Sequence, residues 1–95
     1  MIVEWTAQAR QDQAGQVDYI AQDNPLAAVR VGDEIEQQVA RLATFPKLGR
    51  AGRVRGTREL VIARTPCIVA YRIKGDAVQI LRVLHGAQQW PKRFG

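Results

Sequence analysis

Three short apolar runs fill the second half of the chain, at residues 58–64, 67–74 and 77–85. Val, Ile, Leu, Tyr and Thr dominate these runs, and such a composition favours strands over helices. Thr65-Pro66 separates the first two runs and Lys74-Gly75-Asp76 separates the last two. Because connections this short join antiparallel neighbours, the pattern predicts a three-stranded meander.

Both faces of these strands carry large apolar side chains. Strict alternation divides the last run into one face with Val78, Ile80, Arg82 and Leu84 and another with Ala77, Gln79, Leu81, Val83 and His85. Helices from the first half of the chain can cover one face of the sheet. The other face has no obvious cover, so we expect an exposed apolar sheet face that serves as a partner site.

The first half of the chain follows a helical period. Residues 1–5 suit a brief strand, Thr6 suits the cap of a helix over residues 7–21, and Asn24-Pro25 suits the start of a second helix that runs to about residue 44. Gly15 costs the first helix roughly 0.5–1 kcal/mol relative to Ala. The second helix has an apolar stripe made of Ala28, Val31, Ile35, Val39, Leu42 and Phe45.

These elements predict one α+β domain over residues 1–95, a two-helix hairpin packed on a mainly antiparallel four-stranded sheet, with residues 91–95 as a mobile tail. The chain has 95 residues and one cysteine, Cys67, which we expect to be a small buried or half-buried strand residue. It has no signal peptide and no apolar stretch long enough for a membrane helix, so we expect a cytoplasmic protein without membrane partners. The sequence has no cluster with metal-ligand spacing and no cofactor motif.

The net charge of +5 is distributed unevenly. Residues 1–46 contain three basic and seven acidic side chains, whereas residues 47–95 contain eleven basic and two acidic ones. So basic a half is typical of a protein that meets nucleic acid or an acidic partner, although a solvated basic surface remains an alternative.

Within the basic half, the segment 47–57 interleaves Gly49, Gly52 and Gly56 with arginines, and we expect it to be a loop. It lacks the spacing of a phosphate-binding P-loop and precedes a strand instead of a helix. The candidate residues for binding a target or partner are Arg50, Arg53, Arg55, Arg58, Arg72, Arg82 and Trp90. The alternative interpretation is that the arginines are only exposed to solvent and that Trp90 only anchors the chain end.

Four motifs in fixed order now define a resemblance. NPLAA opens the second helix, GRAGRVRGTREL leads into the sheet, TPCIVAYR lies in the middle and ILRVLHGAQQWP ends it. The chain, from about Val3 to Pro91, resembles the RelE/ParE family of bacterial type II toxins. It departs from the family pattern at Gln13 and Gln16, where apolar residues are usual, and at Cys67, where Tyr is common.

The resemblance implies a growth-inhibiting toxin, of the kind that stabilises plasmids, kept silent by a cognate antitoxin that wraps across it. It also implies contact with promoter DNA only indirectly, through the antitoxin. The RelE-like branch cleaves messenger RNA on the ribosome and needs an acid, a base and a phosphate clamp. In this sequence His85, Glu59 and Arg82 are the candidates for those roles, and the set looks incomplete.

The ParE-like branch lacks that nuclease set and is associated with poisoning DNA gyrase. GRAGRVRGTREL and ILRVLHGAQQWP look more like this branch. The leading interpretation is therefore a ParE-like gyrase poison that is not itself an enzyme and needs no cofactor. A ribosome-dependent endoribonuclease is the alternative.

Overall fold

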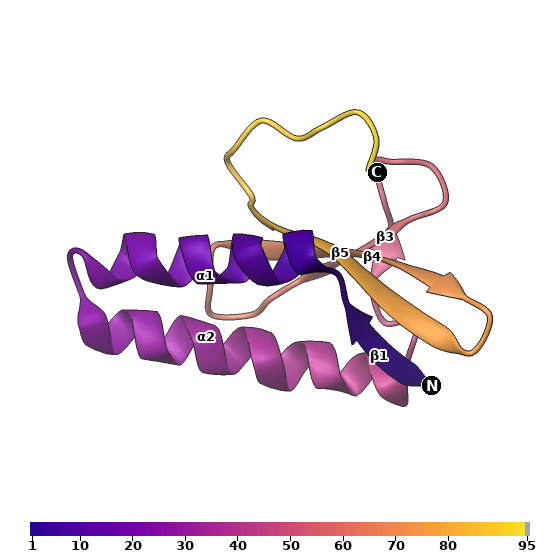
Figure 1. Ribbon diagram of the computed structural model, residues 1–95, viewed down its shortest axis with the longest axis horizontal. Helices are drawn as coiled ribbons and strands as arrows, with labels where there is room; N and C mark the ends of the chain where they lie inside the picture. The colour runs from indigo at the N-terminus through magenta and orange to yellow at the C-terminus, as the bar shows by residue number, and fades with distance from the viewer. Residues whose placement is uncertain (95) are drawn as a thin grey trace.

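The computed structural model describes residues 1–94, in which a helical hairpin packs on a five-stranded sheet (Figure 1). The elements in chain order are β1 (Ile2–Trp5), α1 (Ala7–Ala21), α2 (Pro25–Ala40), the 3₁₀ helix η1 (Arg41–Ala43), β2 (Arg50–Ala51), β3 (Arg58–Val61), β4 (Cys67–Lys74) and β5 (Ala77–His85). The predicted α+β fold is confirmed. Gly95, the last residue of the tail that we expect to be mobile, lies outside the described residues.

The strands follow the order β1-β5-β4-β3-β2. β1 is parallel to β5, and the other three pairs are antiparallel. The prediction of four strands missed β2, two residues of the expected loop that pair with Arg58 and Glu59. A segment rich in Gly and Arg has weak strand propensity, so its pairing depends on β3 being present beside it.

The two helices begin where the sequence predicts. The Thr6 hydroxyl accepts a hydrogen bond from the Ala9 amide, and the Asn24 side chain accepts one from the Ala27 amide. The apolar stripe of the second helix is buried except for Phe45, which is 56% exposed. α2 ends at Ala40 and a 3₁₀ turn follows, so the 3.6-residue period no longer holds at position 45.

A β-bulge in β5 makes the predicted division of its faces wrong. Tyr71 pairs with Ile80 but Ala70 pairs with Arg82, which leaves Leu81 as an extra residue. Beyond the bulge the alternation is therefore shifted by one position. Val83 joins the buried core beneath the helices, together with Val78 and Ile80.

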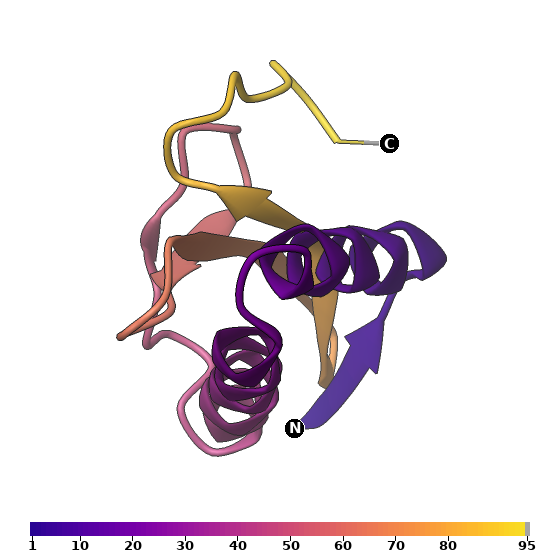
Figure 2. The same ribbon diagram turned by 90° about the vertical axis from the view of Figure 1, so that its left-hand side faces the viewer.

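The sheet face away from the helices is covered, contrary to the expectation of an exposed apolar face. Ile68, Ala70 and Leu84 on this face are buried, as is Val54 in the loop after β2. Figure 2 shows this loop and the tail after β5 lying on the far side of the sheet from α2. A Cβ atom added to Gly86 would lie 3.5 Å from Ile68 Cδ1, so the tail packs directly on the sheet.

Among residues 1–94, the structure contains no helix with the length and hydropathy required to cross a membrane.

Candidate functional site

Glu59 organises the arginine loop from the centre of β3. Its side chain is only 3% exposed, and its two oxygens accept hydrogen bonds from both neighbouring arginines of the loop. Arg53 donates from its backbone amide over 2.7 Å and from Nε over 3.1 Å, and Arg50 donates from Nη2 over 3.2 Å. The carboxylate thereby fixes the path of the loop and the direction of two cationic side chains.

Burial by itself would raise the pKa of Glu59, but the hydrogen bonds from Arg53 and Arg50 and the charge of Arg53 lower this pKa below its ordinary value. Glu59 is therefore an ionised acceptor at neutral pH. General acid catalysis needs the opposite, a carboxyl group with a raised pKa. In this structure Glu59 is the acceptor that positions two arginines of the loop.

Trp90 joins the tail to this cluster. The Arg53 guanidinium lies 3.7 Å from the centre of the Trp90 ring, a cation–π contact. The indole Nε1 atom is buried without a hydrogen-bond partner in the described part of the chain. Trp90 therefore anchors the chain end through its ring face, and Arg53 connects it to Glu59.

Arg58 has a structural role on the other face of the same strand. Its Nη1 donates to the Gly49 carbonyl over 2.8 Å. The Gly49 amide in turn donates to the Tyr71 hydroxyl over 2.8 Å, and this hydroxyl donates to the Pro46 carbonyl over 2.7 Å. Burial raises the pKa of Tyr71, which keeps the phenol protonated as this donor. Arg58 and Tyr71 therefore hold the entry to β2 in place.

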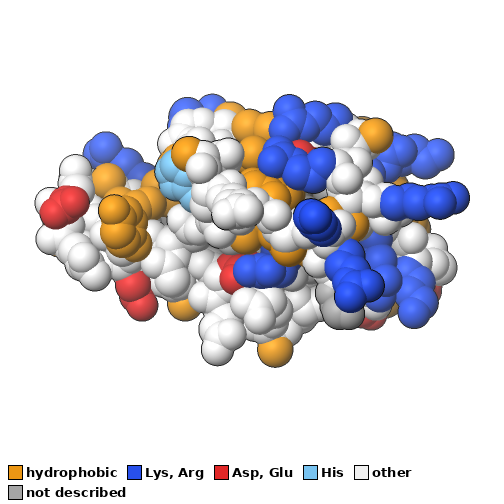
Figure 3. All heavy atoms as spheres, turned by 90° about the horizontal axis from the view of Figure 1, so that it is seen from above, with side chains coloured by type: hydrophobic (Ala, Val, Ile, Leu, Met, Phe, Trp, Pro, Cys, Tyr) orange, Lys and Arg blue, Asp and Glu red, His pale blue; other side chains and the backbone are white. Residues whose placement is uncertain are grey.

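Several basic side chains gather at one end of the molecule. Figure 3 looks onto the face with the tail and shows most of its Lys and Arg side chains toward the right-hand end of this view. Arg50, Arg53 and Arg55 are exposed in the segment after η1, and Arg72 is exposed on β4 with its Nε donating to Gln79. We call this surface the basic end, defined by Arg50, Arg53, Arg55 and Arg72.

The three nuclease candidates do not converge. Glu59, Ala70 and Arg82 lie in one row across β3, β4 and β5, so two strand spacings, roughly 10 Å, separate Glu59 from Arg82. Arg82 is bound to Asp12, with its Nε 2.7 Å from Oδ2. His85 pairs with Cys67 and belongs to the opposite, helix-facing side of the sheet. No single bound phosphate could meet all three side chains in this arrangement.

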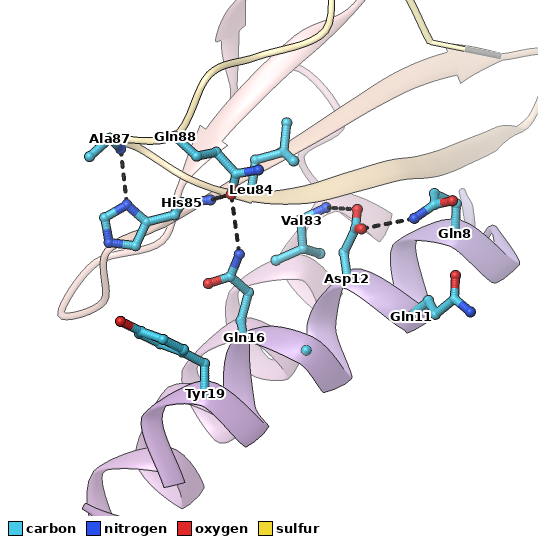
Figure 4. A pocket seen from close by; sticks show the side chains of 11 residues that line it. Gln8, Gln11, Asp12, Gln16, Tyr19, Val83, Leu84, His85, Ala87 and Gln88 are labelled. Carbon is cyan, nitrogen blue, oxygen red and sulfur yellow. Dashed lines mark hydrogen bonds between the residues drawn. The ribbon is translucent and has the colours of Figure 1, made fainter. Parts of the chain in front are cut away.

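His85 instead lines a groove of about 650 Å³ between α1 and the end of β5 (Figure 4). Its Nδ1 accepts a hydrogen bond from the Ala87 amide over 3.0 Å. Polar and apolar groups share its walls, and the lining residues include Gln8, Asp12, Gly15, Gln16, Tyr19, Leu84 and Gln88. We call this hollow the amide groove.

A second surface, not foreseen from the sequence, is apolar. Phe45, Leu48 and Val61 are 56%, 41% and 50% exposed, and we call them the apolar strip. Shallow hollows of about 600 and 380 Å³ border the strip, with Arg41 lining both. The only sequence signal for this surface is Phe45-Pro46 directly after the second helix, where the apolar period ends.

The strip lies at an incompletely paired sheet edge. β2 pairs only with Arg58 and Glu59, so the edge of β3 continues past it. Farther along, Gln38 from α2 takes the place of a neighbouring strand. Its side chain donates to the Ala63 carbonyl over 3.0 Å and accepts from the Ala63 amide over 2.8 Å. Val61 lies between β2 and Gln38, the two groups that cover this edge. Backbone N–H and C=O groups alternate between the two edges of a strand, so those of Val61 face the same edge as those of Ala63.

The described residues contain neither a cluster suited to a metal ion nor an accessible thiol. Residues 1–94 contain no group of three or more His, Cys, Asp or Glu side chains that could hold a metal ion. Cys67 is buried, as predicted. Burial raises the pKa of its thiol, which keeps it in the unreactive protonated form.

A helical hairpin packed on a mostly antiparallel five-stranded sheet, with a basic end, is the arrangement expected for the RelE/ParE class of small toxins. Residues 3–90 match the family model of the ParE toxin of the type II toxin–antitoxin system parDE. The chain belongs to this family and is the toxin component of such a system.

Individual relatives agree with this assignment. The protein Y4kP of Sinorhizobium fredii, whose name assigns it provisionally to the toxins, is 48% identical over 92 residues, 95% of this chain and 93% of its own. Toxin RelE2 of Caulobacter vibrioides is 35% identical over 90% of this chain and 96% of its own. A solved chain of the chromosomal ParDE system from P. aeruginosa superposes with a TM-score of 0.82 and 31% identity, covering 90% of this chain and 95% of that one.

Proposed function

We propose that this toxin stops bacterial growth by poisoning DNA gyrase in the cytoplasm, and that a cognate antitoxin neutralises it. The separation of Glu59, Arg82 and His85 supports this proposal most directly. Cleavage of RNA requires an acid, a base and a phosphate clamp within hydrogen-bond reach of one scissile bond. Here the carboxylate already binds two arginines, Arg82 binds Asp12, and the histidine lies on the other face of the sheet.

The basic end is the surface that would meet the target. Arg50, Arg53, Arg55 and Arg72 present guanidinium groups that suit phosphate or carboxylate partners. A complex of gyrase with DNA offers such anionic groups, and arginines held by Glu59 and Trp90 lose less freedom on binding than free ones. Arg58 contributes by fixing the loop, and Arg82 by joining β5 to α1.

The apolar strip is the surface that we assign to the antitoxin. Phe45, Leu48 and Val61 offer apolar contact, and Arg41 and Lys47 beside them favour an acidic partner. An extended antitoxin segment could add to the β3 edge at Val61, where backbone groups face outward. Any contact with promoter DNA would then be made by the antitoxin and not by this chain.

The decisive experiment is gyrase-dependent DNA cleavage with purified toxin, gyrase, plasmid and ATP. We expect linear, protein-linked DNA to accumulate and purified antitoxin to suppress it. The variant His85→Ala should retain this activity. If gyrase is unaffected while the toxin still stops growth, the gyrase proposal is wrong.

The same variant tests the alternative, a ribosome-dependent messenger RNA endoribonuclease. One observation favours that alternative, namely the similarity to a relative named Toxin RelE2. A nuclease that uses His85 as acid or base would lose roughly 10²–10⁴-fold in cleavage rate on His85→Ala. Primer extension on ribosome-bound messenger RNA would show this loss directly.

A further inference from the structure

We infer that the basic end binds the phosphate backbone of duplex DNA directly and without reading its sequence. The inference rests on the proposed function, because gyrase at work offers a toxin both protein and duplex DNA, and it assigns the duplex to this surface. Arginines that contact the sugar–phosphate backbone position a protein but carry no sequence information. A promoter would therefore still be recognised through the antitoxin.

The first supporting observation is that cations from separate strands share one face of the sheet. Glu59, which holds two arginines of the loop, lies opposite Ala70 on the face away from the helices. Arg72 and Lys74 follow Ala70 at steps of two along β4, so their side chains leave on the same face, and both are exposed. From Ala70 to Lys74 is roughly 13 Å. Duplex DNA carries one negative charge per about 1.7 Å of its axis, so this length faces several phosphates.

The second observation is that the charge of this face is positive. Glu59 balances only one of the two arginines that it holds, and the exposed side chains of Arg55, Arg72 and Lys74 add their charges. Over residues 47–75 the chain has eight lysines and arginines, and Glu59 is its only acid. Figure 3 shows the basic side chains gathered toward one end of this face. An anionic partner is therefore attracted here.

The cationic area has clear limits. Glu4 on β1 lies opposite Gln79, which lies opposite Arg72, so two strand spacings, roughly 10 Å, separate Glu4 from Arg72. Asp76 is exposed in the turn after β4. The amide groove has no lysine or arginine among the described residues that line it. A bound duplex would therefore extend over the arginine loop and β4, and not over β1 or the groove.

The third observation is that the loop presents its arginines on a fixed backbone. The Gly52 amide donates to the Thr57 carbonyl over 2.8 Å, and the Thr57 amide donates to the Val54 carbonyl over 3.2 Å. Val54 is buried, and Arg53 and Arg55 flank it with exposed side chains. Guanidinium groups held in this way lose less freedom on binding than those of a flexible loop.

The surface lacks the apolar anchors of a protein interface. Tight protein–protein contacts centre on buried aromatic or aliphatic side chains. Among residues 1–94, none of the exposed large apolar side chains lies in the segment 50–57 or on β4. The apolar strip adjoins the basic end only at Arg50, through the hollow that Leu48 and Val61 also line. Binding to phosphates requires no apolar anchor, because it is driven by the release of counterions.

A single strand of RNA or DNA fits this surface less well than a duplex. Single strands are held largely by bases that stack on exposed aromatic rings. In the described part of the chain the exposed aromatic rings are Tyr19 on α1 and Phe45 after η1. The Trp90 ring, which contacts the loop, is covered by the Arg53 guanidinium at 3.7 Å. A backbone-directed contact with a duplex needs no such ring.

The test measures binding of purified toxin, free of antitoxin, to a short fluorescein-labelled DNA duplex by fluorescence anisotropy at several salt concentrations. We expect a Kd within roughly 1–100 μM near physiological salt, the range of non-specific binding. Each phosphate that the toxin neutralises adds about 0.9 to the slope of log K against log salt. With about three or four phosphates, affinity should fall roughly 40–150-fold between about 50 and 200 mM salt.

Two double variants locate the contact. Arg55→Gln with Arg72→Gln should weaken duplex binding about tenfold or more and reduce the salt slope by about 2. Arg30→Gln with Arg41→Gln is the matched control, because it removes the same charge from exposed positions on α2 and η1 outside the basic end. The control should bind like the wild type, and both variants should keep the wild-type Tm, because all four side chains are exposed.

Gyrase-dependent DNA cleavage with the same proteins separates this inference from the proposed function. We expect the basic-end variant to lose gyrase poisoning together with duplex binding, and the control to keep both. A variant that loses poisoning but binds the duplex like the wild type would place gyrase itself on the basic end and overturn the inference.

Two further results would also overturn it. One is a wild-type toxin that binds no duplex or binds it independently of salt. The other is tighter binding to a single-stranded RNA of the same length, which would assign the surface to RNA. Duplex binding as expected, with gyrase unaffected, would overturn the gyrase proposal and leave the DNA-binding surface in place.

Discussion

At the scale of single residues, the buried carboxylate of Glu59 holds two arginine side chains in place at a basic surface. Removing a carboxylate from water is costly unless charged hydrogen bonds replace the lost solvation. Glu59 receives them from Arg53 and Arg50, whose own side chains remain about half exposed. The anion is therefore stabilised where it lies, and two cations are held at the surface with their outer edges free for a partner.

Glu59→Gln should destabilise the protein by about 1–3 kcal/mol at pH 7, the usual range for losing charge-assisted hydrogen bonds to a buried group. The pKa of Glu59 is lowered in the folded state, so its stabilisation is fully present above the unfolded pKa of about 4.3 and disappears as pH falls through the folded pKa. The gap between wild type and variant, measured by urea unfolding, should therefore narrow below about pH 4.3.

Glu36→Gln is the matched control for this prediction. Glu36 also pairs with an arginine, Arg10, but about half of each side chain in this pair is exposed. An exposed pair contributes about 0–1 kcal/mol, so this variant should lose little stability at pH 7. Equal losses in both variants would show that the burial of Glu59 has no special importance.

The sequence predicted the roles of single residues correctly where a side chain and its hydrogen-bond partner lie close together along the chain. Thr6 and Asn24 were predicted as helix caps because a cap needs only its own helix, and both side chains accept the expected amide hydrogen bonds. The pairing of Arg82 with Asp12 joins residues 70 positions apart, and no local pattern indicates it. Glu59 was chosen as a possible acid because the sequence does not reveal the two arginines that keep it ionised.

At the scale of elements, the edge of β3 is protected by a side chain in place of a strand. An exposed strand edge presents unpaired N–H and C=O groups and invites pairing with other chains. Gln38 binds both groups of Ala63 from the neighbouring helix α2. The open length of the edge is thereby limited to Val61, between Gln38 and β2.

Gln38→Ala should cost about 0.5–1.5 kcal/mol of stability, because two hydrogen bonds are lost at a site that water can reach. It should also speed hydrogen exchange at the Ala63 amide, which loses its acceptor. Urea unfolding and amide exchange by NMR would measure the two effects.

Gln37→Ala offers the comparison at the next position of the same helix. Gln37 is exposed, so this variant should leave both stability and the Ala63 amide unchanged. Fast exchange of the Ala63 amide in the wild type would contradict the role assigned to Gln38.

Among the elements, the long periodic ones were predictable and the short irregular ones were not. β4 and β5 have the bounds that the sequence indicates, because eight or nine β-forming residues between clear turns leave little choice. The bulge at Leu81 and the two-residue strand β2 depend on partners across the sheet, which a local pattern does not contain. The sequence did not predict that the sheet face away from the helices is covered. Gly86 and Trp90 follow the last strand, and nothing in their local pattern indicates that this segment packs back on the sheet.

At the scale of the whole molecule, the two proposed partner surfaces differ in chemistry but adjoin each other. The basic end extends from the segment after η1 to β4, and the apolar strip lies where α2 ends beside the β3 edge. Leu48 and Val61 of the strip line the same hollow as Arg50 of the basic end. An antitoxin bound on the strip would therefore lie against the surface that we propose for the target.

The strip can be tested by placing a charge in it. Leu48→Asp puts a carboxylate at a position that is 41% exposed, so the free protein should fold with nearly unchanged stability. Burying that carboxylate under a partner is costly, so antitoxin affinity should fall by about tenfold or more. Val29→Asp is the matched control, because Val29 is 59% exposed on α2 and belongs to neither proposed surface. Calorimetry with both variants would measure the difference, and equal affinities would place the antitoxin elsewhere.

An apolar-surface dye adds an independent check on the strip. The free toxin should bind more dye than the antitoxin complex does, and Leu48→Asp should bind less dye than the wild type.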